Sequence, residues 1–275
     1  MQQQTVKSTV QSQFGANAEK YATSPVHAKG ASLARLVELV QPRQSWRVLD
    51  IATAAGHTAL TFAPHVAEVI ASDITPQMLE QASKLANERG INNLTTVQAD
   101  AENLPFANNS FDLVTCRIAA HHFPHIPAFL AEVRRVVKPG GIFALVDNLA
   151  PGRDSPPTQQ QFTDAELQDA ASAYNAFEKL RDPSHARSLP LPEWHDLIAA
   201  AGLVERHCEL LAKPMAFQPW AERMLGTQNP GSIGYLKAIL TTAPPALRAF
   251  LQPHDRDGKL IFSEHEALII AQHPA

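Results

Sequence analysis

The sequence predicts a doubly wound α/β fold, in which a mostly parallel sheet is covered by helices on both faces. Between residues 46 and 147, short apolar segments alternate with segments of helical pattern, and this alternation is typical of parallel sheets. The apolar segments, among them WRVLDIA and IFALVDN, are almost continuously apolar, as expected of strands that are buried on both faces. Helices that close on glycine separate several of them.

Five strands are expected in this stretch, around residues 46–52, 68–74, 94–99, 111–118 and 142–148. The helices between them are expected to begin near residue 58 and to cover residues 76–90 and 127–141. Beyond residue 147 we expect a helix over 164–182, a helix over 192–203, a strand over 204–212, a mainly helical stretch over 214–253 and a strand over 265–273.

This order favours one α/β core over two independent domains. Residues 1–45 are interpreted as an N-terminal helical arm over the active site, and residues 46–275 as the core. Two insertions interrupt the core, at about 151–190 and 214–253, and the first is rich in Pro, Gln, Asp and Ser. We expect both insertions to act as lids, because segments inserted after strand ends commonly carry binding residues.

Composition excludes several classes of protein. The 275 residues are 45% hydrophobic and 18% charged, as in ordinary globular proteins, with a net charge of −4 and no cluster of Lys or Arg. A nucleic-acid partner normally needs a basic surface, so none is expected. No run reaches the roughly 18 apolar residues of a membrane span, and the N-terminus lacks a signal-peptide core. The two cysteines, Cys116 and Cys208, are expected to be reduced in a cytoplasmic protein.

Acidic residues stand at the ends of three consecutive predicted strands. Asp50 ends the first strand and precedes a loop of small residues, Ala-Thr-Ala-Ala-Gly, which would let the backbone approach a ligand. Asp73 ends the second strand about 20 residues after that loop, the spacing at which a carboxylate can accept both hydroxyls of a ribose. Asp100 follows the third strand, where its carboxylate could accept an adenine amino proton beside the N–H of Ala101.

With these motifs the chain resembles the class I S-adenosylmethionine-dependent methyltransferases. The order VLDIAT, ASDITPQML, DAENLPF with FDLV, and VKPGG carries the resemblance over residues 46–147, and the ubiquinone and menaquinone C-methyltransferases are the branch it resembles most. The resemblance implies a seven-stranded Rossmann-like sheet with an antiparallel last strand. It implies S-adenosylmethionine as the cofactor, bound by Asp50, Ala52, Ala54, Gly56, Asp73, Ile74, Met78, Asp100, Ala101, Glu102 and Arg117.

Two positions depart from the family pattern. Ala54 stands where the family's loop usually has its first glycine, and it would cost about 1 kcal/mol or more if the turn requires φ > 0. We expect the loop to keep its function, because Ala has the smallest side chain with a Cβ. After the fourth strand, CRIAAHHF replaces the Arg-Asn pair of the quinone enzymes, which argues against a quinone substrate.

His121 and His122 follow the fourth strand and are the predicted catalytic residues. An imidazole is a suitable base for taking a proton from the atom that receives the methyl group. The alternative is that one ring packs inward and the other caps the next turn. A metal site formed with His125 is disfavoured, because Pro124 breaks any helix that would align the side chains, so no metal is expected.

The first insertion and the arm supply the predicted substrate contacts. The segment FEKLRDPSHARS brings Arg181, His185 and Arg187 close together in sequence; the alternative is a solvated turn whose charges pair with each other. Asp147 and Asn148, at the end of the fifth strand, are expected to face the same region. In the arm, Tyr21 and His27 are candidates for closing the pocket, although an ordinary surface helix would explain Tyr21 as well.

The sequence therefore predicts a cytoplasmic enzyme that transfers a methyl group from S-adenosylmethionine to a small molecule. Two alternatives remain: a protein that binds S-adenosylmethionine or S-adenosylhomocysteine without transferring methyl, and an RNA methyltransferase, which the pI of about 6.3 disfavours. The sequence does not indicate whether carbon, oxygen, nitrogen or sulfur is methylated.

Overall fold

A computed structural model describes residues 2–22, 30–155, 162–226 and 229–275 of the chain. The chain forms two compact units. Unit 1 comprises Met1–Asp147, Asp196–Glu209 and Leu268–Ala275, and unit 2 comprises Asn148–His195 and Leu210–Ala267. The two segments that the sequence marks as insertions, 151–190 and 214–253, both fall within unit 2.

The sheet is mostly parallel, as the sequence predicts. Its strand order is β3 (Leu94–Gln98), β2 (Glu68–Asp73), β1 (Arg47–Ile51), β4 (Phe111–Arg117), β5 (Val137–Asn148), β8 (Lys259–Gln272) and β6 (Val204–Ala216). The first five strands pair in parallel. β8 runs against β5, because Gly140 of β5 donates its N–H to His273 while Leu149, just past β5, donates to His265. A short strand, β7 (His254–Arg256), pairs with β8 in a hairpin.

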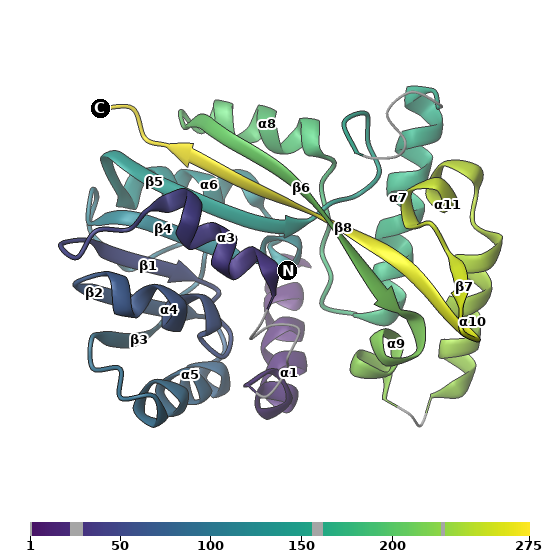
Figure 1. The fold of residues 1–275 in the computed structure, drawn as a ribbon, viewed down its shortest axis with the longest axis horizontal. Coiled ribbons are helices and arrows are strands. Elements are labelled where there is room, and N and C mark those ends of the chain that lie inside the picture. Colours follow the sequence, from purple (N-terminus) through teal and green to yellow (C-terminus); the bar gives the residue numbers. More distant parts are fainter. Residues whose placement is uncertain (1, 23–29, 156–161, 227–228) are drawn as a thin grey trace. The chain divides into compact units, whose positions relative to one another are not determined.

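Helices cover the strands of unit 1. They are α3 (Ala31–Val40), α4 (His57–Phe62), α5 (Pro76–Glu88) and α6 (Ile126–Val136), and Figure 1 shows them on both faces of the sheet. The sequence of α5 explains its position: proline stands in the first turn, where its missing N–H is harmless, and Met78, Leu79, Ala82 and Ala86 form one buried face. The N-terminal helix α1 (Gln2–Ala22) packs against α5, beside the carboxyl ends of β1–β3 (Figure 1).

The boundaries of α6, β5, β6 and β8 differ from the sequence prediction. The helix expected over 127–141 ends at Val136, and β5 begins at Val137. Pairing with β4 explains this, because Val137 is in register with Phe111 and a bulge follows between Phe111 and Leu113. Gly141 permits the close approach, since a Cβ there would lie 2.9 Å from the carbonyl oxygen of Lys138. β6 and β8 are likewise longer than expected, extending to Ala216 and starting at Lys259.

Unit 2 is mainly helical. It contains α7 (Asp164–Arg181), α9 (Phe217–Leu225), α10 (Pro230–Thr242) and α11 (Pro245–Leu251), and α8 (Leu191–Ala200) begins in it. A capping box starts α7: Thr163 accepts the Glu166 N–H and the Glu166 carboxylate accepts the Thr163 N–H. Aromatic packing fills the interior, where Trp220 stacks on Phe177 with ring centroids 5.1 Å apart. Among the described residues, no helix is long and apolar enough to cross a membrane.

Candidate functional site

The strand ends of unit 1 and helix α1 line a pocket that is partly open to solvent. The structure brings most of the predicted cofactor residues together in its lining. These residues are Asp50, Ala52, Ala54, Asp73, Ile74, Met78, Asp100, Ala101, Glu102 and Arg117, and the predicted base His122 joins them.

Asp50 lies at the end of β1, almost completely buried. Its carboxylate accepts hydrogen bonds from the hydroxyls of Thr53 at 2.5 Å and Thr115 at 2.6 Å, and from the N–H of Ala59 at 3.2 Å. Burial raises the pKa of Asp50 to about 6, and the hydrogen bonds from Thr115 and Thr53 and the charge of Arg117 only partly offset it. Asp50 therefore holds the loop to the first turn of α4 and also borders the pocket.

The loop after β1 has alanine at two positions where the backbone is left-handed. Ala52 has φ of 50° and Ala54 has φ of 49°, so both adopt the left-handed conformation that disfavours a Cβ. Ala54 therefore has φ > 0, the case in which Ala costs about 1 kcal/mol or more, and the expectation that the loop keeps its function stays a prediction. Gly56 has φ of 83°, and a Cβ there would lie 2.9 Å from that of Ala82 in α5. Packing against α5 therefore requires glycine at position 56. The resemblance implies that Gly56 binds the cofactor, but Gly56 is not among the residues that line the pocket.

Asp73, at the end of β2, is the second buried acid of the pocket. It accepts the N–H of Ala54 at 2.9 Å and the N–H of Thr75 at 2.8 Å. Burial raises its pKa, against the lowering effect of these backbone donors. Beside it, the Thr75 hydroxyl is buried and also lowers the pKa of Asp73. Because each carboxylate oxygen can accept further bonds, Asp73 and Thr75 together can receive a ligand hydroxyl.

Asp100 and Glu102 form the third acidic group, after β3. Lys7 of α1 lies 2.6 Å from a carboxylate oxygen of each. Asp100 also accepts the N–H of Glu102 at 3.0 Å, and Glu102 accepts the N–H of His125 at 2.6 Å. The acids predicted from the strand ends thus already have a cation between them, supplied by a helix distant in sequence.

Two residues at the end of β4 add a charge and a strained backbone. The guanidinium of Arg117 donates from Nε to the Thr58 hydroxyl at 3.1 Å and lines the pocket. The next residue, Ile118, has φ of 53° although it is β-branched, and its N–H donates to Val146 at 2.7 Å. A β-branched residue in this region is an outlier, and such strain is concentrated at functional sites.

The two candidate histidines occupy different positions. His122 lines the pocket, with its ring 5.0 Å from that of Phe14 in an edge contact. His121 lies behind it, at a ring separation of 4.2 Å, and its Nδ1 is 2.7 Å from Asp147. The second carboxylate oxygen of Asp147 is buried without a partner among the described residues. His125 is the ring that caps the next turn, accepting the Ala128 N–H at 3.0 Å, so it does not join the pair in a metal-binding arrangement.

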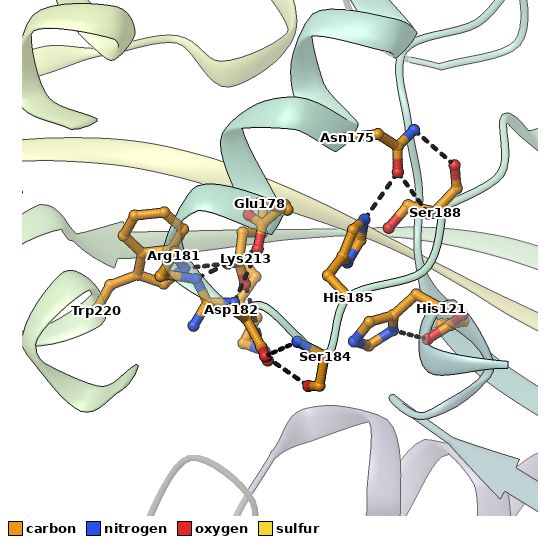
Figure 2. Close-up of polar contacts among 12 residues, drawn as sticks. His121, Asn175, Glu178, Arg181, Asp182, Ser184, His185, Ser188, Lys213 and Trp220 are labelled. Carbon is orange, nitrogen blue, oxygen red and sulfur yellow. Dashed lines mark hydrogen bonds and ion pairs between the residues drawn. The ribbon is translucent and has the colours of Figure 1, made fainter. Parts of the chain in front are cut away.

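In unit 2, the predicted substrate residues Arg181 and His185 contact other side chains of the same unit. Figure 2 shows Arg181 between Glu178, which it meets at 2.8 Å, and the ring of Trp220, whose centroid is 4.4 Å from the guanidinium carbon. His185 meets the amide oxygen of Asn175 at 2.8 Å. The charges pair within the unit, as the alternative expects, but the segment is largely buried and not solvated. A substrate role for either residue stays a prediction.

The remaining predicted substrate residues are placed less favourably or lie outside the described structure. Arg187 forms a double salt bridge with Glu193 at 2.6 Å, with 55% of its side chain exposed. Asn148 is buried in unit 2, and its amide oxygen has no partner among the described residues. His27 and the side chain of Tyr21 lie outside the residues that the structure describes.

Several residues of the pocket were not predicted from the sequence. The most important are on α1, where Lys7, Val10 and Phe14 line the pocket and Gln11 donates to the carbonyl of Ile74 at 2.9 Å. Their spacing of three and four residues places them on one helix face, but the polar composition around them gives little amphipathic contrast. Thr58, Thr75 and Phe123 were missed because single residues of these types are common in any loop.

Comparison with known proteins identifies the family. Residues 49–145 match the family described as a methyltransferase domain. An uncharacterized methyltransferase of Bacillus subtilis strain 168, YcgJ, is 39% identical over 215 residues, which cover 78% of this chain and 79% of that protein. The chain belongs to the class I S-adenosylmethionine-dependent methyltransferases. The crystal structure of the Bacillus subtilis YcgJ protein superposes with a TM-score of 0.78 at 34% identity, covering 89% of this chain and 98% of that one.

A second relative matches a shorter part of this methyltransferase. The ubiquinone/menaquinone C-methyltransferase UbiE of Zymomonas mobilis is 41% identical over 107 residues, which cover 39% of this chain and 44% of that protein. The chain therefore spans less than half the length of this relative.

The pocket of this methyltransferase fits the cofactor that its family implies. Asp73 and the buried hydroxyl of Thr75 suit a ribose, since both can form hydrogen bonds with hydroxyl groups. Apolar side chains, including Val10, Met78 and Phe123, provide walls for a flat ring. The four carboxylates of the lining outnumber its two cations, Lys7 and Arg117, as suits a ligand carrying a positive sulfur.

Proposed function

We propose that this methyltransferase transfers a methyl group from S-adenosylmethionine to a small-molecule acceptor, with His122 as the base. The observation that carries the proposal is the meeting of Asp50, Asp73, Asp100 and His122 around one pocket. Three carboxylates from successive strand ends bind the cofactor, and an imidazole from the next strand end faces the same space. When bound, S-adenosylmethionine supplies a methyl group on a positively charged sulfur, which a nucleophile can displace in line.

The chain's own residues bind and orient the reactants. Asp73 and Thr75 hold the ribose hydroxyls, Asp100 and the backbone of Ala101 hold the adenine edge, and Arg117 holds the carboxylate of the methionine part. Ile74, Met78 and the strained Ala52–Ala54 loop shape the walls between them. Much of the catalysis then comes from positioning two reactants while water is kept out.

His122 takes the proton of the acceptor atom as that atom attacks. Its ring lies in the pocket, and the pair of His121 with Asp147 supports it from behind at a ring separation of 4.2 Å. His121 is therefore a positioning residue in this proposal, because Asp147 fixes its ring through Nδ1. The acceptor in this proposal is a small molecule of the cytoplasm, as the sequence predicts. The segment CRIAAHHF argues against a quinone.

The cofactor part is tested by calorimetric titration with S-adenosylhomocysteine. Asp73→Ala should weaken binding by about 1–3 kcal/mol, because a charge-assisted contact to the ribose is lost. Asp164→Ala is the matched control, since its carboxylate is exposed and pairs with Arg153 in unit 2. Equal affinity of wild type and Asp73→Ala would overturn the cofactor assignment.

The transfer part is tested by an acceptor screen. Amines, alcohols, phenols, thiols and carbon acids are offered with S-adenosylmethionine, and release of S-adenosylhomocysteine is measured. Turnover with any of them supports the enzyme. Tight cofactor binding without turnover on any class would instead favour a protein that binds the cofactor without transferring methyl, and a gel shift with bulk RNA covers the RNA alternative.

A further inference from the structure

Helix α1 presents one face to the pocket. Lys7, Val10, Gln11 and Phe14 follow each other at helical spacing, and each contacts the pocket or its rim. One turn after Gln11, Gly15 allows close packing against α5, since a Cβ there would lie 3.1 Å from the side-chain oxygen of Gln77. The helix is thus seated both on α5 and on the open side of the site.

Lys7 is the charged contact of this face. Its ammonium lies 2.6 Å from Asp100 and 2.6 Å from Glu102, with 24% of the lysine side chain exposed and 8% of that of Glu102. Burial lowers the pKa of Lys7, but the hydrogen bonds that its ammonium donates to the two carboxylates outweigh this effect, so the pKa of Lys7 is raised overall. Lys7 is therefore charged throughout the neutral range and shared between two acids.

Glu102 connects this contact to the loop of the proposed base. Its second oxygen accepts the N–H of His125 at 2.6 Å. His125 is the N-cap of α6 and ends the short segment that carries His122. On the same helix face as Lys7, Phe14 meets the His122 ring edge-on at 5.0 Å. Helix α1 thus contacts the loop at His122 directly and at His125 through Glu102.

We propose that Lys7 is a positioning residue that fastens α1 over the cofactor pocket and, through Glu102, sets the position of the His122 loop. The inference rests on the proposed function, because it assigns the pocket to the cofactor. Each ion pair is a charge-assisted hydrogen bond in a partly buried setting, which makes it directional and stronger than a bond between neutral groups. Exchange of a ligand beneath α1 then requires both pairs to open together.

The test compares Lys7→Met with two matched variants. Lys7→Arg keeps the charge and can bridge both carboxylates, and Lys84→Met removes the same charge from an exposed site on α5. Surface plasmon resonance with S-adenosylhomocysteine gives the association and dissociation rates. We expect Lys7→Met to speed dissociation by about three- to thirtyfold, with Lys7→Arg and Lys84→Met within about twofold of wild type. Raising the salt concentration should speed dissociation from wild type more than from Lys7→Met.

A second readout follows the imidazole of His122 by NMR. Its resonances are assigned from their loss in His122→Asn, without ligand present. Lys7→Met should shift them through Glu102 and His125, whereas Lys84→Met should leave them in place. Glu102→Gln, which keeps an oxygen for the His125 N–H but removes the charge, should speed dissociation like Lys7→Met. If Lys7→Met does not fold, Glu102→Gln is measured in its place.

The outcomes separate this inference from the proposed function. If wild type fails to bind S-adenosylhomocysteine, the cofactor assignment is wrong, and the NMR comparison alone decides whether Lys7 positions the loop. If wild type binds but Lys7→Met keeps both its dissociation rate and the His122 resonances, the positioning role is wrong. Equal effects of Lys7→Met and Lys84→Met would also overturn it, because net charge would then explain the result.

Discussion

Buried carboxylates occur in both units of the protein, but their partners differ. In unit 1, Asp50 and Asp73 accept hydrogen bonds from hydroxyl and backbone donors and border a pocket. In unit 2, Glu178 pairs with Arg181 at 2.8 Å, and Glu264 accepts the indole N–H of Trp220 at 2.5 Å. Lys213 adds a cation 2.8 Å from Glu266.

The difference separates acids that can bind a ligand from acids that stabilise a fold. A buried acid that is held by hydroxyl and backbone donors has its pKa raised by burial, as the pKa of about 6 for Asp50 illustrates even though the charge of Arg117 partly lowers it. Such an acid gains from a donor that a ligand brings. An acid paired with a buried guanidinium is already compensated, and the pair holds local structure.

The largest effect is expected at the pocket, on turnover. With an acceptor found by the screen, His122→Ala should lower kcat by about 10²–10⁴-fold, because the base is lost, while S-adenosylhomocysteine still binds. The rate of wild type should fall as acidic pH protonates the imidazole, provided that the acceptor must lose a proton. His122→Ala with full activity and a flat pH profile would mean that the acceptor is already nucleophilic and needs no base.

Unit 2 should respond through stability rather than through ligand binding. Arg181→Met leaves Glu178 buried without its partner and should lower the free energy of unfolding by about 3–5 kcal/mol in urea titrations. Arg187→Met breaks a salt bridge with Glu193 that is largely exposed, and should cost less than about 1 kcal/mol. If Arg181→Met instead keeps stability and weakens binding of the acceptor, Arg181 belongs to the substrate site, as the sequence first suggested.

Asp50 should give the protein a pH-dependent stability that Asp50→Asn lacks. Its pKa of about 6 in the folded state exceeds the ordinary value of 3.8, so the folded state binds more protons between these values. Asp50 therefore contributes about 3 kcal/mol to the free energy of unfolding below pH 4, and this contribution is lost as the pH rises towards 6. Urea unfolding of both proteins between pH 4 and pH 7 measures this. A constant difference across that range would show that Asp50 stays ionised.

The smallest effect is expected in the strained loop. Ala54→Gly should raise the free energy of unfolding by about 0.5–1 kcal/mol, because relief of the left-handed strain exceeds the added entropy of the unfolded chain. Affinity for S-adenosylhomocysteine should stay within about tenfold. Ala216→Gly is the control, since Ala216 has φ of −76° and should lose roughly 0.5–1 kcal/mol. Loss of stability in both variants would mean that the Ala54 methyl group packs favourably.

Much of the pocket could be predicted from the sequence because parallel strands impose order on it. Three apolar runs define strands whose carboxyl ends share one edge of the sheet. The first two runs end near Asp50 and Asp73, and the third is followed by Ala99 and Asp100, just beyond β3. The position of each acid relative to its strand therefore fixes its neighbourhood without knowledge of any distant contact. The same reasoning located the His121–His122 segment, since it follows the next strand along the sheet.

Only the tertiary structure decided which charged groups are free to bind and which are not. Lys7 reaches Asp100 and Glu102 across more than 90 residues of chain, and Arg181 meets Trp220 from another helix. It also decided that His122 faces the pocket while His121 pairs with Asp147, although the two are adjacent in sequence. The physical reason is that burial and pairing depend on elements that pack together from distant parts of the chain, whereas a strand end is a local feature.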